Sequence, residues 1–252
     1  MTQKYKKSVC WILTIGDIST PEEHFSSKRM QKYRQSVRKL EETEYKFDVV
    51  KLTPELLKDF VVVYDDYIGS KEGGIVYPVA ERIEKAWSEG AVYEIITLHK
   101  GDELIGGLLF RQTKAGALTV AYRVFPYKLD IKLSLSPAYI SEYLLMKRAL
   151  ELGAKTIIHG RDQNAYGLNS DIGLATYKLQ AGAIPYISAR KDNPELEMPE
   201  KLDNDVLVCV GSEPRKPCKE LVLYTDMSDE EARAKYPKLA NLTEIPLRVE
   251  KR

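Results

Sequence analysis

A polar run directly after a predicted strand holds the residue types best suited to chemistry. The run from Gly160 to Gly167 reads GRDQNAYG and combines charged, amide and phenol side chains. In open α/β sheets, ligands bind outside the carboxyl ends of strands. An arginine suits bidentate binding of a carboxylate or phosphate, and Asp162 could accept the proton of an amine nucleophile. The candidate substrate-binding residues are Arg161, Asn164 and Tyr166; the alternative is an Arg-Asp turn capped by Asn164.

Two helices and two strands must position this run. Ser136 is a suitable N-cap with Pro137 at the first helical position, and Gly153 stops that helix. The β-branched run that follows is too short for a helix and suits a buried strand. Tyr177 and Lys178 fall in the last turns of the second helix. The predicted order is helix 136–153, strand 155–159, helix 169–180 and strand 183–187.

The rest of the chain also divides into helices and strands. Short turns that contain glycine predict that the strands at 92–99, 103–113 and 117–127 form an antiparallel meander. The elements predicted before the meander are strand 9–15, helix 26–42, strand 46–53, helix 54–70, a glycine hinge at 71–74 and helix 78–88. Those predicted after position 187 are a loop at 188–204, strands 205–210 and 220–225, and helix 228–236.

The helix at 26–42 is conspicuously basic. Its Lys and Arg residues recur at three- and four-residue intervals and can therefore line one face. Such a face could contact the phosphates of RNA or of a phosphorylated substrate, and the alternative is an ordinary solvated helix face. Lys28, Arg34 and Arg38 are the candidate tRNA contacts.

Composition and charge narrow the function classes. With 252 residues, 44% of them hydrophobic, the chain can bury a sizeable core. Its 38 Lys and Arg residues against 37 Asp and Glu give a net charge of +1, so a nucleic acid or membrane would need a local patch. No window approaches the roughly 20 apolar residues that span a bilayer.

The cysteines and histidines suggest neither a disulfide framework nor a metal centre. Cys10, Cys209 and Cys218 have no CxxC spacing, and their odd number argues against a disulfide framework. The histidines are isolated, so we expect no metal site. The apolar run at 9–15 lacks a small-residue cleavage site. We expect a cytoplasmic protein with no tightly bound cofactor.

The element order from 46 to 225 resembles the GCN5-related N-acetyltransferase (GNAT) fold. A finer resemblance is to the peptidoglycan-bridge aminoacyltransferases of the FemAB type. It depends on the basic helix at 25–39, on ALELGA at 149–154 followed by a strand, and on GLATYKLQAG at 173–182. The fold that the resemblance implies is an α/β (α+β) one: a mixed, mostly antiparallel central sheet flanked by helices.

The resemblance also implies catalytic residues. In FemAB-type enzymes an aromatic-Lys pair lies in the helix that matches 173–180, and the lysine is assigned to stabilising charge during acyl transfer. These roles would fall on Tyr177 and Lys178. A positioned ammonium can neutralise a developing oxyanion. The alternative is that Tyr177 packs in the core and Lys178 is solvated.

The implied co-substrate is acyl-CoA or aminoacyl-tRNA. The glycine-rich turn with which GNAT enzymes cradle a pyrophosphate is replaced here by KLDIKLSLSP at 128–137, which contains no glycine. The chain has room for one complete GNAT-like unit and a fragment. Candidates for contacting the donor's phosphates at the helix N-terminus are Lys132, Ser134 and Ser136. Candidates for lining the acyl-donor groove are Tyr122 and Arg123, although strand alternation explains these two equally well.

Two functional hypotheses follow. In the first, the chain transfers an acyl or aminoacyl group to a small-molecule or peptide amine by direct attack, without a covalent enzyme intermediate. In the second, it is a catalytically silent GNAT-like module that binds a ligand or a protein. The predicted divisions are an N-terminal strand and basic helix (1–45), the acyltransferase domain (46–225) and a C-terminal helix and tail (226–252).

Overall fold

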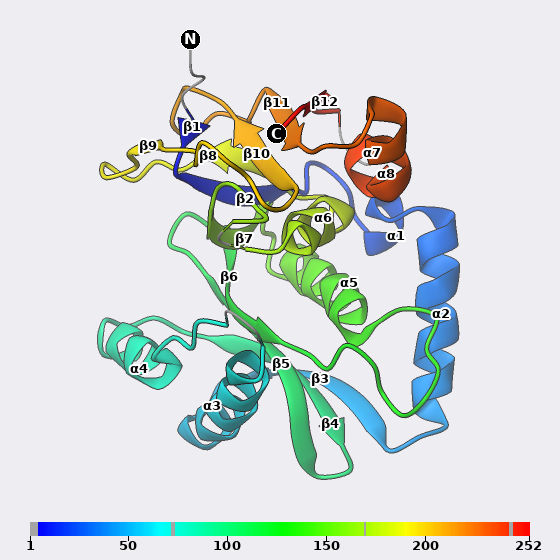
Figure 1. Cartoon of the computed structure of the whole chain (residues 1–252). Coiled ribbons are helices and arrows are strands. Elements are labelled where there is room, and N and C mark those ends of the chain that lie inside the picture. The colour runs from blue at the N-terminus through cyan, green and yellow to red at the C-terminus, as the bar shows by residue number, and fades with distance from the viewer. Residues whose placement is uncertain (1–4, 72–73, 169, 242–243) are drawn as a thin grey trace. The chain divides into compact units, whose positions relative to one another are not determined.

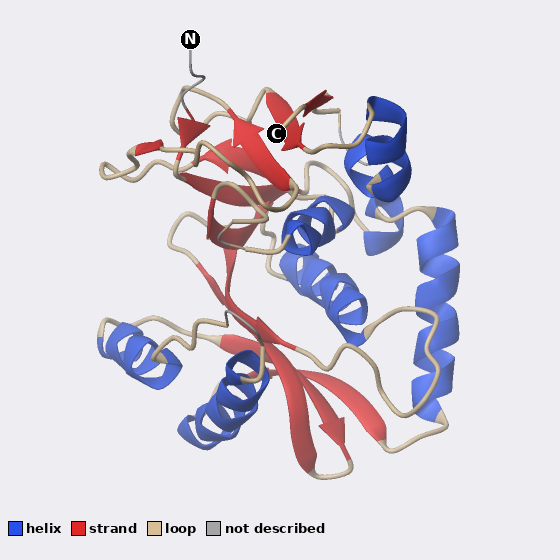
Figure 2. Cartoon of the chain, viewed as in Figure 1, coloured by secondary structure: helices blue, strands red, loops and turns tan. Residues whose placement is uncertain are grey.

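The computed structural model describes residues 5–71, 74–168, 170–241 and 244–252 (Figure 1). Contacts divide the chain into two compact units, which we call unit 1 (Met1–Thr14 and Ile158–Arg252) and unit 2 (Ile15–Ile157). Strands and helices occur in both units (Figure 2). The strands pair mostly antiparallel, which confirms the predicted mixed α/β class. The predicted divisions at 45 and 225 stay a prediction.

Unit 2 contains an antiparallel sheet made by consecutive strands. Its strands are β3 (Tyr45–Lys51), β4 (Glu94–Lys100), β5 (Glu103–Gln112) and β6 (Leu118–Val124). Each strand pairs antiparallel with the next. The predicted meander is therefore confirmed, and β3 adds a fourth strand at its edge.

Helices pack against this sheet through apolar stripes. The helices of unit 2 are α1 (Pro21–His24), α2 (Ser27–Glu41), α3 (Pro54–Gly69), α4 (Val79–Ser88) and α5 (Pro137–Glu151). In α3, Leu57, Phe60 and Tyr64 are buried at helical spacing, and the helix contacts β5 and β6. Packing of this stripe outweighs the β-branched run that follows Phe60. At the end of α5, Gly153 adopts a φ of +67°, a left-handed conformation that glycine allows at little cost.

Unit 1 brings a strand near the N-terminus into one sheet with two strands from much later in the chain. Strand β2 (Ser8–Thr14) lies between β7 (Thr156–Gln163) and β8 (Ile184–Ile187), and it pairs antiparallel with β8. The partners of β2 follow it by about 150 residues or more in the chain, so no local sequence pattern could have indicated the pairing.

A second set of strands in unit 1 was only partly predicted. Strands β10 (Val206–Val210) and β11 (Glu220–Tyr224) are confirmed, as is α7 (Asp229–Lys235). The elements of unit 1 that we missed are β1 (Tyr5–Lys6), β9 (Glu195–Leu196), α8 (Pro237–Asn241) and β12 (Leu247–Glu250), and in unit 2 the short helix α1 was missed as well. Strand β9 corrects the prediction that 188–204 is loop throughout. These elements are too short to show a hydrophobic period, and β12 is stabilised by parallel pairing with β11.

The candidate run after the predicted strand 155–159 also needs a correction. Strand β7 continues to Gln163, so Arg161 and Asp162 lie on a strand and not in a loop. Helix α6 (Ile172–Gln180) begins after Asp171, whose side chain accepts the Gly173 N–H. The predicted start at Asn169, and part of the predicted hinge at 71–74, lie outside the described residues.

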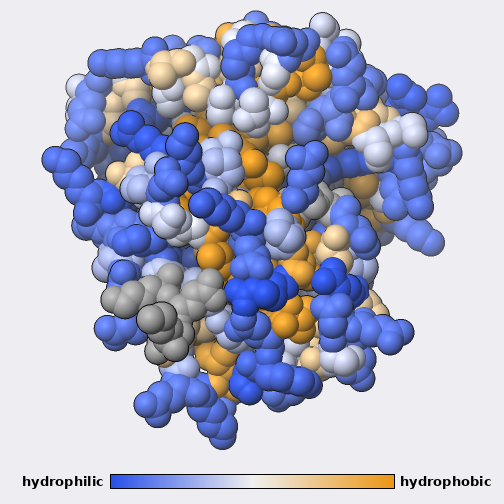
Figure 3. Space-filling model, turned by 90° about the horizontal axis from the view of Figure 1, so that it is seen from above, coloured by the Kyte–Doolittle hydropathy of each residue, from blue (hydrophilic) through white to orange (hydrophobic). Residues whose placement is uncertain are grey.

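The surface carries both hydrophilic and apolar residues. In the view of Figure 3, hydrophilic residues cover most of the surface, and apolar ones show between them. Among the described residues, no helix combines the length and the apolar character that a membrane crossing would need.

Candidate functional site

An ion pair in unit 1 joins two of the predicted catalytic residues. Lys178 on α6 places its Nζ 2.8 Å from Asp162 Oδ1 and 2.7 Å from Asp162 Oδ2. The two side chains are only 7% and 11% exposed. Such a pair is costly to desolvate, and it persists in a folded protein where further hydrogen bonds satisfy its atoms.

Two aromatic residues extend this pair into a hydrogen-bonded network. The Tyr166 hydroxyl donates to Asp162 Oδ2 at 2.8 Å, and Trp11 Nε1 donates to the Tyr166 oxygen at 2.6 Å. Both aromatic side chains are fully buried. The Lys178 ammonium also lies 5.9 Å from the centre of the Trp11 ring, within the range of a cation–π contact. Three separate segments of unit 1 therefore contribute to this network.

The charges of the network act on its neighbours. Burial, followed by the negative charge of Asp162, holds the pKa of Tyr166 well above its ordinary value, so this phenol stays protonated. Burial also raises the pKa of the half-buried Cys10 thiol, against the opposing effects of Arg161 and Lys178. The charges of the site therefore act on the pKa of Cys10. Because that pKa is raised, the thiol is a poor nucleophile.

The other residues predicted in the run serve different purposes. The Asn164 side chain is fully buried and bonds to Lys6 O, Cys209 O and Cys209 N, so its amide holds backbone segments together. Arg161 is exposed on β7, and Tyr177 is half-buried on α6. The structure thus joins Asp162, Tyr166 and Lys178, and it gives the Asn164 amide a structural task.

The groove candidates lie in unit 2 and have partners there. Tyr122 accepts a hydrogen bond from Arg82 Nη1 at 3.4 Å, and its ring meets Tyr64 edge to face. Arg123 forms an ion pair with the buried Glu142, with an Nη2–Oε1 distance of 2.5 Å. Burial of Glu142 on α5 is a feature that the sequence did not suggest.

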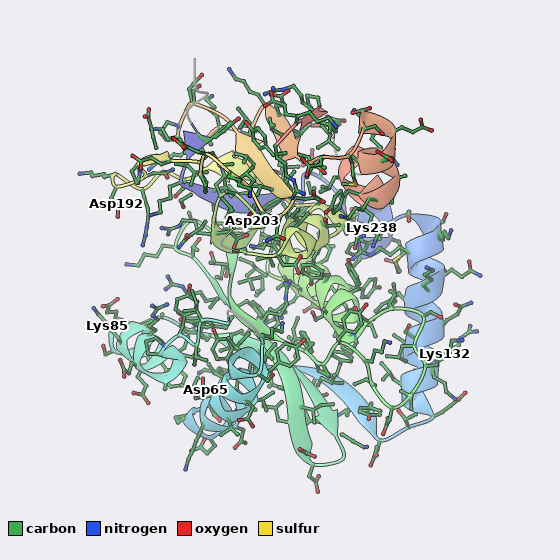
Figure 4. The ribbon with its side chains drawn as sticks, viewed as in Figure 1. Asp65, Lys85, Lys132, Asp192, Asp203 and Lys238 are labelled. Atoms are coloured by element: carbon green, nitrogen blue, oxygen red, sulfur yellow. The ribbon has the colours of Figure 1, made fainter. Side chains whose placement is uncertain are left out.

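The phosphate candidates flank α2. The Ser134 hydroxyl donates to Gln35, and the Leu135 N–H donates to the Ser36 hydroxyl, so this loop lies along α2. Lys132 is exposed on the same loop (Figure 4). Ser136 is the N-cap of α5 but makes no side-chain capping bond. The basic residues of α2 that are exposed are Lys28, Lys32, Arg34, Arg38 and Lys39.

Sequence reasoning missed Trp11. It stands in an apolar run that we predicted as a strand, and alternation along β2 explains why it faces inward beside two other buried residues. Nothing in the run signalled that its N–H would meet Tyr166. Among the described residues, no group of three or more His, Cys, Asp or Glu side chains could hold a metal ion.

Solved structures resemble this arrangement of elements. The crystal structure of FemX matches with a TM-score of 0.52 and 16% sequence identity, over 70% of this chain and 59% of that one. The fold is similar to that of FemX. At this identity the likeness concerns the fold, and in that respect it agrees with the resemblance to the FemAB type.

Two further structures match less well. L-PGS from Bacillus licheniformis matches with a TM-score of 0.42 and 19% identity, over 63% of this chain and 46% of that one. The C-terminal domain of a putative lysylphosphatidylglycerol synthetase from Agrobacterium fabrum matches with a TM-score of 0.48 and 13% identity, over 73% and 60%. This chain therefore spans between 46% and 60% of the length of the three structures. No family model and no curated protein matches it.

Proposed function

We propose that this chain is an acyltransferase that passes an acyl or aminoacyl group to an amine by direct attack. The observation that carries the proposal is the Lys178–Asp162 pair, a cation and a carboxylate 2.7 Å apart. The similarity of the fold to FemX supports it. A preorganised ammonium in a site of low exposure stabilises developing negative charge more strongly than water does.

The chemistry divides between the two side chains. The amine nitrogen attacks the carbonyl carbon of the donor, a C–N bond forms, and the carbonyl oxygen becomes an oxyanion that the Lys178 ammonium stabilises. Asp162 accepts the proton that the amine loses. Collapse of the intermediate breaks the C–O bond of an aminoacyl ester or the C–S bond of a thioester, and the proton passes to the leaving oxygen or sulfur.

The basic face of α2 supports aminoacyl-tRNA as the donor. Lys28 and Lys39 are both exposed and stand eleven positions apart, which is about 16 Å along a helix axis. A positive face of that length can contact several phosphates of an RNA strand, whereas CoA offers a more compact group. Acyl-CoA, bound near Ser134 and Ser136, is the alternative donor.

Transfer assays with both donors test the proposal. Purified protein is incubated with radiolabelled aminoacyl-tRNA or acetyl-CoA and a panel of amines and amine-bearing peptides, and labelled amide product is measured. Lys178→Met should lower the transfer rate by about 10²–10³-fold. Lys235→Met is the matched control, because Lys235 pairs with Asp205 at 2.8 Å in the same unit but is 55% exposed.

Two results would refute the proposal. One is no amide product from either donor across the panel. The other is wild-type transfer by a folded Lys178→Met protein. Saturable binding of a donor or an amine, without transfer, would instead support the silent binding module.

A further inference from the structure

We propose that Trp11 and Tyr166 are positioning residues, which fix Asp162 and through it the ammonium of Lys178. This inference rests on the proposed function, because it assigns a task in that reaction to two residues that touch no substrate. It also changes the prediction for Tyr166, whose hydroxyl we expected to bind substrate.

The direction of the hydrogen bonds follows from the chemistry of the groups. An indole N–H can only donate, so the Tyr166 oxygen accepts from Trp11. The phenol has a single proton, and a carboxylate such as Asp162 can only accept it. Trp11 therefore donates to Tyr166, and Tyr166 donates its only hydroxyl proton to Asp162.

Trp11 contacts both ends of the network. Its N–H fixes the Tyr166 hydroxyl, and the face of its ring lies 5.9 Å from Lys178 Nζ. The Trp11 and Tyr166 rings also meet edge to face at 6.1 Å. Because a lysine side chain is flexible and its ammonium has no fixed hydrogen-bonding plane, its position depends on such neighbours.

The backbone around Tyr166 is unusually well fixed. Ala165 adopts a φ of +63°, which is uncommon for a residue with a Cβ. The Asn164 side chain accepts the Ala165 N–H, and Tyr166 exchanges two backbone hydrogen bonds with Leu207. Strain of this kind persists where the surrounding structure over-determines it, and it concentrates at functional sites. The Tyr166 ring is thus held from its backbone as well as through its hydroxyl.

The raised pKa of Tyr166 supports its role as a hydrogen-bond donor, because the phenol keeps its proton. A phenol kept protonated by burial and by the nearby carboxylate gives its proton to Asp162 throughout the neutral range. An error of about 1 Å in a catalytic group can cost on the order of 10²-fold in rate. Loss of the Tyr166 hydroxyl should therefore act on the chemical step and leave substrate binding largely unchanged.

The test compares Tyr166→Phe and Trp11→Phe with matched controls. Tyr93→Phe and Trp87→Phe replace a buried tyrosine and a half-buried tryptophan of unit 2. The first readout needs no substrate: the ¹⁵N resonance of the Lys178 ammonium, assigned by its loss in Lys178→Met. We expect this resonance to shift or broaden in the two network variants while the rest of the amide spectrum is retained, and to stay unchanged in the controls.

The second readout is steady-state transfer from the donor that the wild-type protein uses. Both network variants should lower kcat by about 10- to 100-fold with KM within twofold of wild type. An unchanged Lys178 resonance in folded Tyr166→Phe would overturn the positioning role, and so would an unchanged kcat. Absence of transfer by wild type would refute the proposed function, whereas the resonance would still report whether Tyr166 positions Lys178.

Discussion

Replacing Lys178 with methionine would leave the Asp162 carboxylate buried beside an apolar side chain of similar length. Asp162 is 11% exposed and would keep the Tyr166 hydroxyl as a donor. Removing one partner of a buried pair costs about 3–5 kcal/mol, because the remaining charge is uncompensated. Asp162→Asn should cost a similar amount, since it leaves the Lys178 ammonium buried.

The double variant Lys178→Met/Asp162→Asn measures the interaction free energy between the two side chains. With both charges removed, the penalty of an unpaired charge disappears, and the Asn oxygen can still accept from Tyr166. We expect the double variant to lose about 3 kcal/mol less free energy of unfolding than the two single losses added together. That difference is the upper end of the interaction energies of residues in contact. The control Lys235→Met should lose at most about 1 kcal/mol, since Lys235 is 55% exposed.

Urea unfolding measures these differences. In a Trp87→Phe background, Trp11 is the only tryptophan, so its fluorescence follows the unfolding of unit 1. A loss of 3–5 kcal/mol would also lower Tm by about 6–20 °C. Single losses below about 1 kcal/mol, or losses that simply add, would refute a tightly coupled buried pair.

Three further predictions follow from the same structure. Asn164→Ala removes a fully buried amide that bonds to backbone groups, so it should cost at least about 3 kcal/mol in urea unfolding; a loss below 1 kcal/mol would contradict this. Gly167→Ala should cost about 2 kcal/mol or more by the same measurement, because Gly167 has a φ of +104°, and unchanged stability would show that this conformation is not required. Arg34→Glu/Arg38→Glu should weaken tRNA binding and reduce the dependence of log K on log salt by about 2, whereas Lys85→Glu on α4 should do neither; equal affinities in a filter-binding titration would exclude Arg34 and Arg38 as RNA contacts.

Much of the local structure could be predicted from the sequence. Pro137 in the first turn, the stop at Gly153 and the spacing of apolar residues between them define α5, although the Ser136 side chain makes no capping bond. Glycine-bearing turns and alternation define the antiparallel strands of unit 2. The polar run after His159 was recognised as a candidate site because charged, amide and phenol side chains follow a predicted strand, where ligands bind in open α/β sheets.

The contacts within the candidate site could not be predicted in the same way. Asp162 and Lys178 were both predicted to be catalytic, but on separate grounds, and their pairing is a contact across sixteen positions. Asn164 has a side chain that could bind a ligand, yet it is buried and its amide bonds to backbone atoms instead. Residue type indicates what a side chain can bond to, and only its surroundings decide which bond it makes.

The sequence by itself therefore determined the types of the longer elements, most of their approximate bounds and the location of the polar run. Tertiary structure alone decided that β2 lies between β7 and β8, that β12 joins β11, and that Trp11 donates to Tyr166. The physical reason is range: helical period, alternation and caps act over a few residues, and they can be read locally. Pairing of distant segments depends on which apolar surfaces and backbone groups satisfy one another once the chain has folded, and that choice leaves no local pattern.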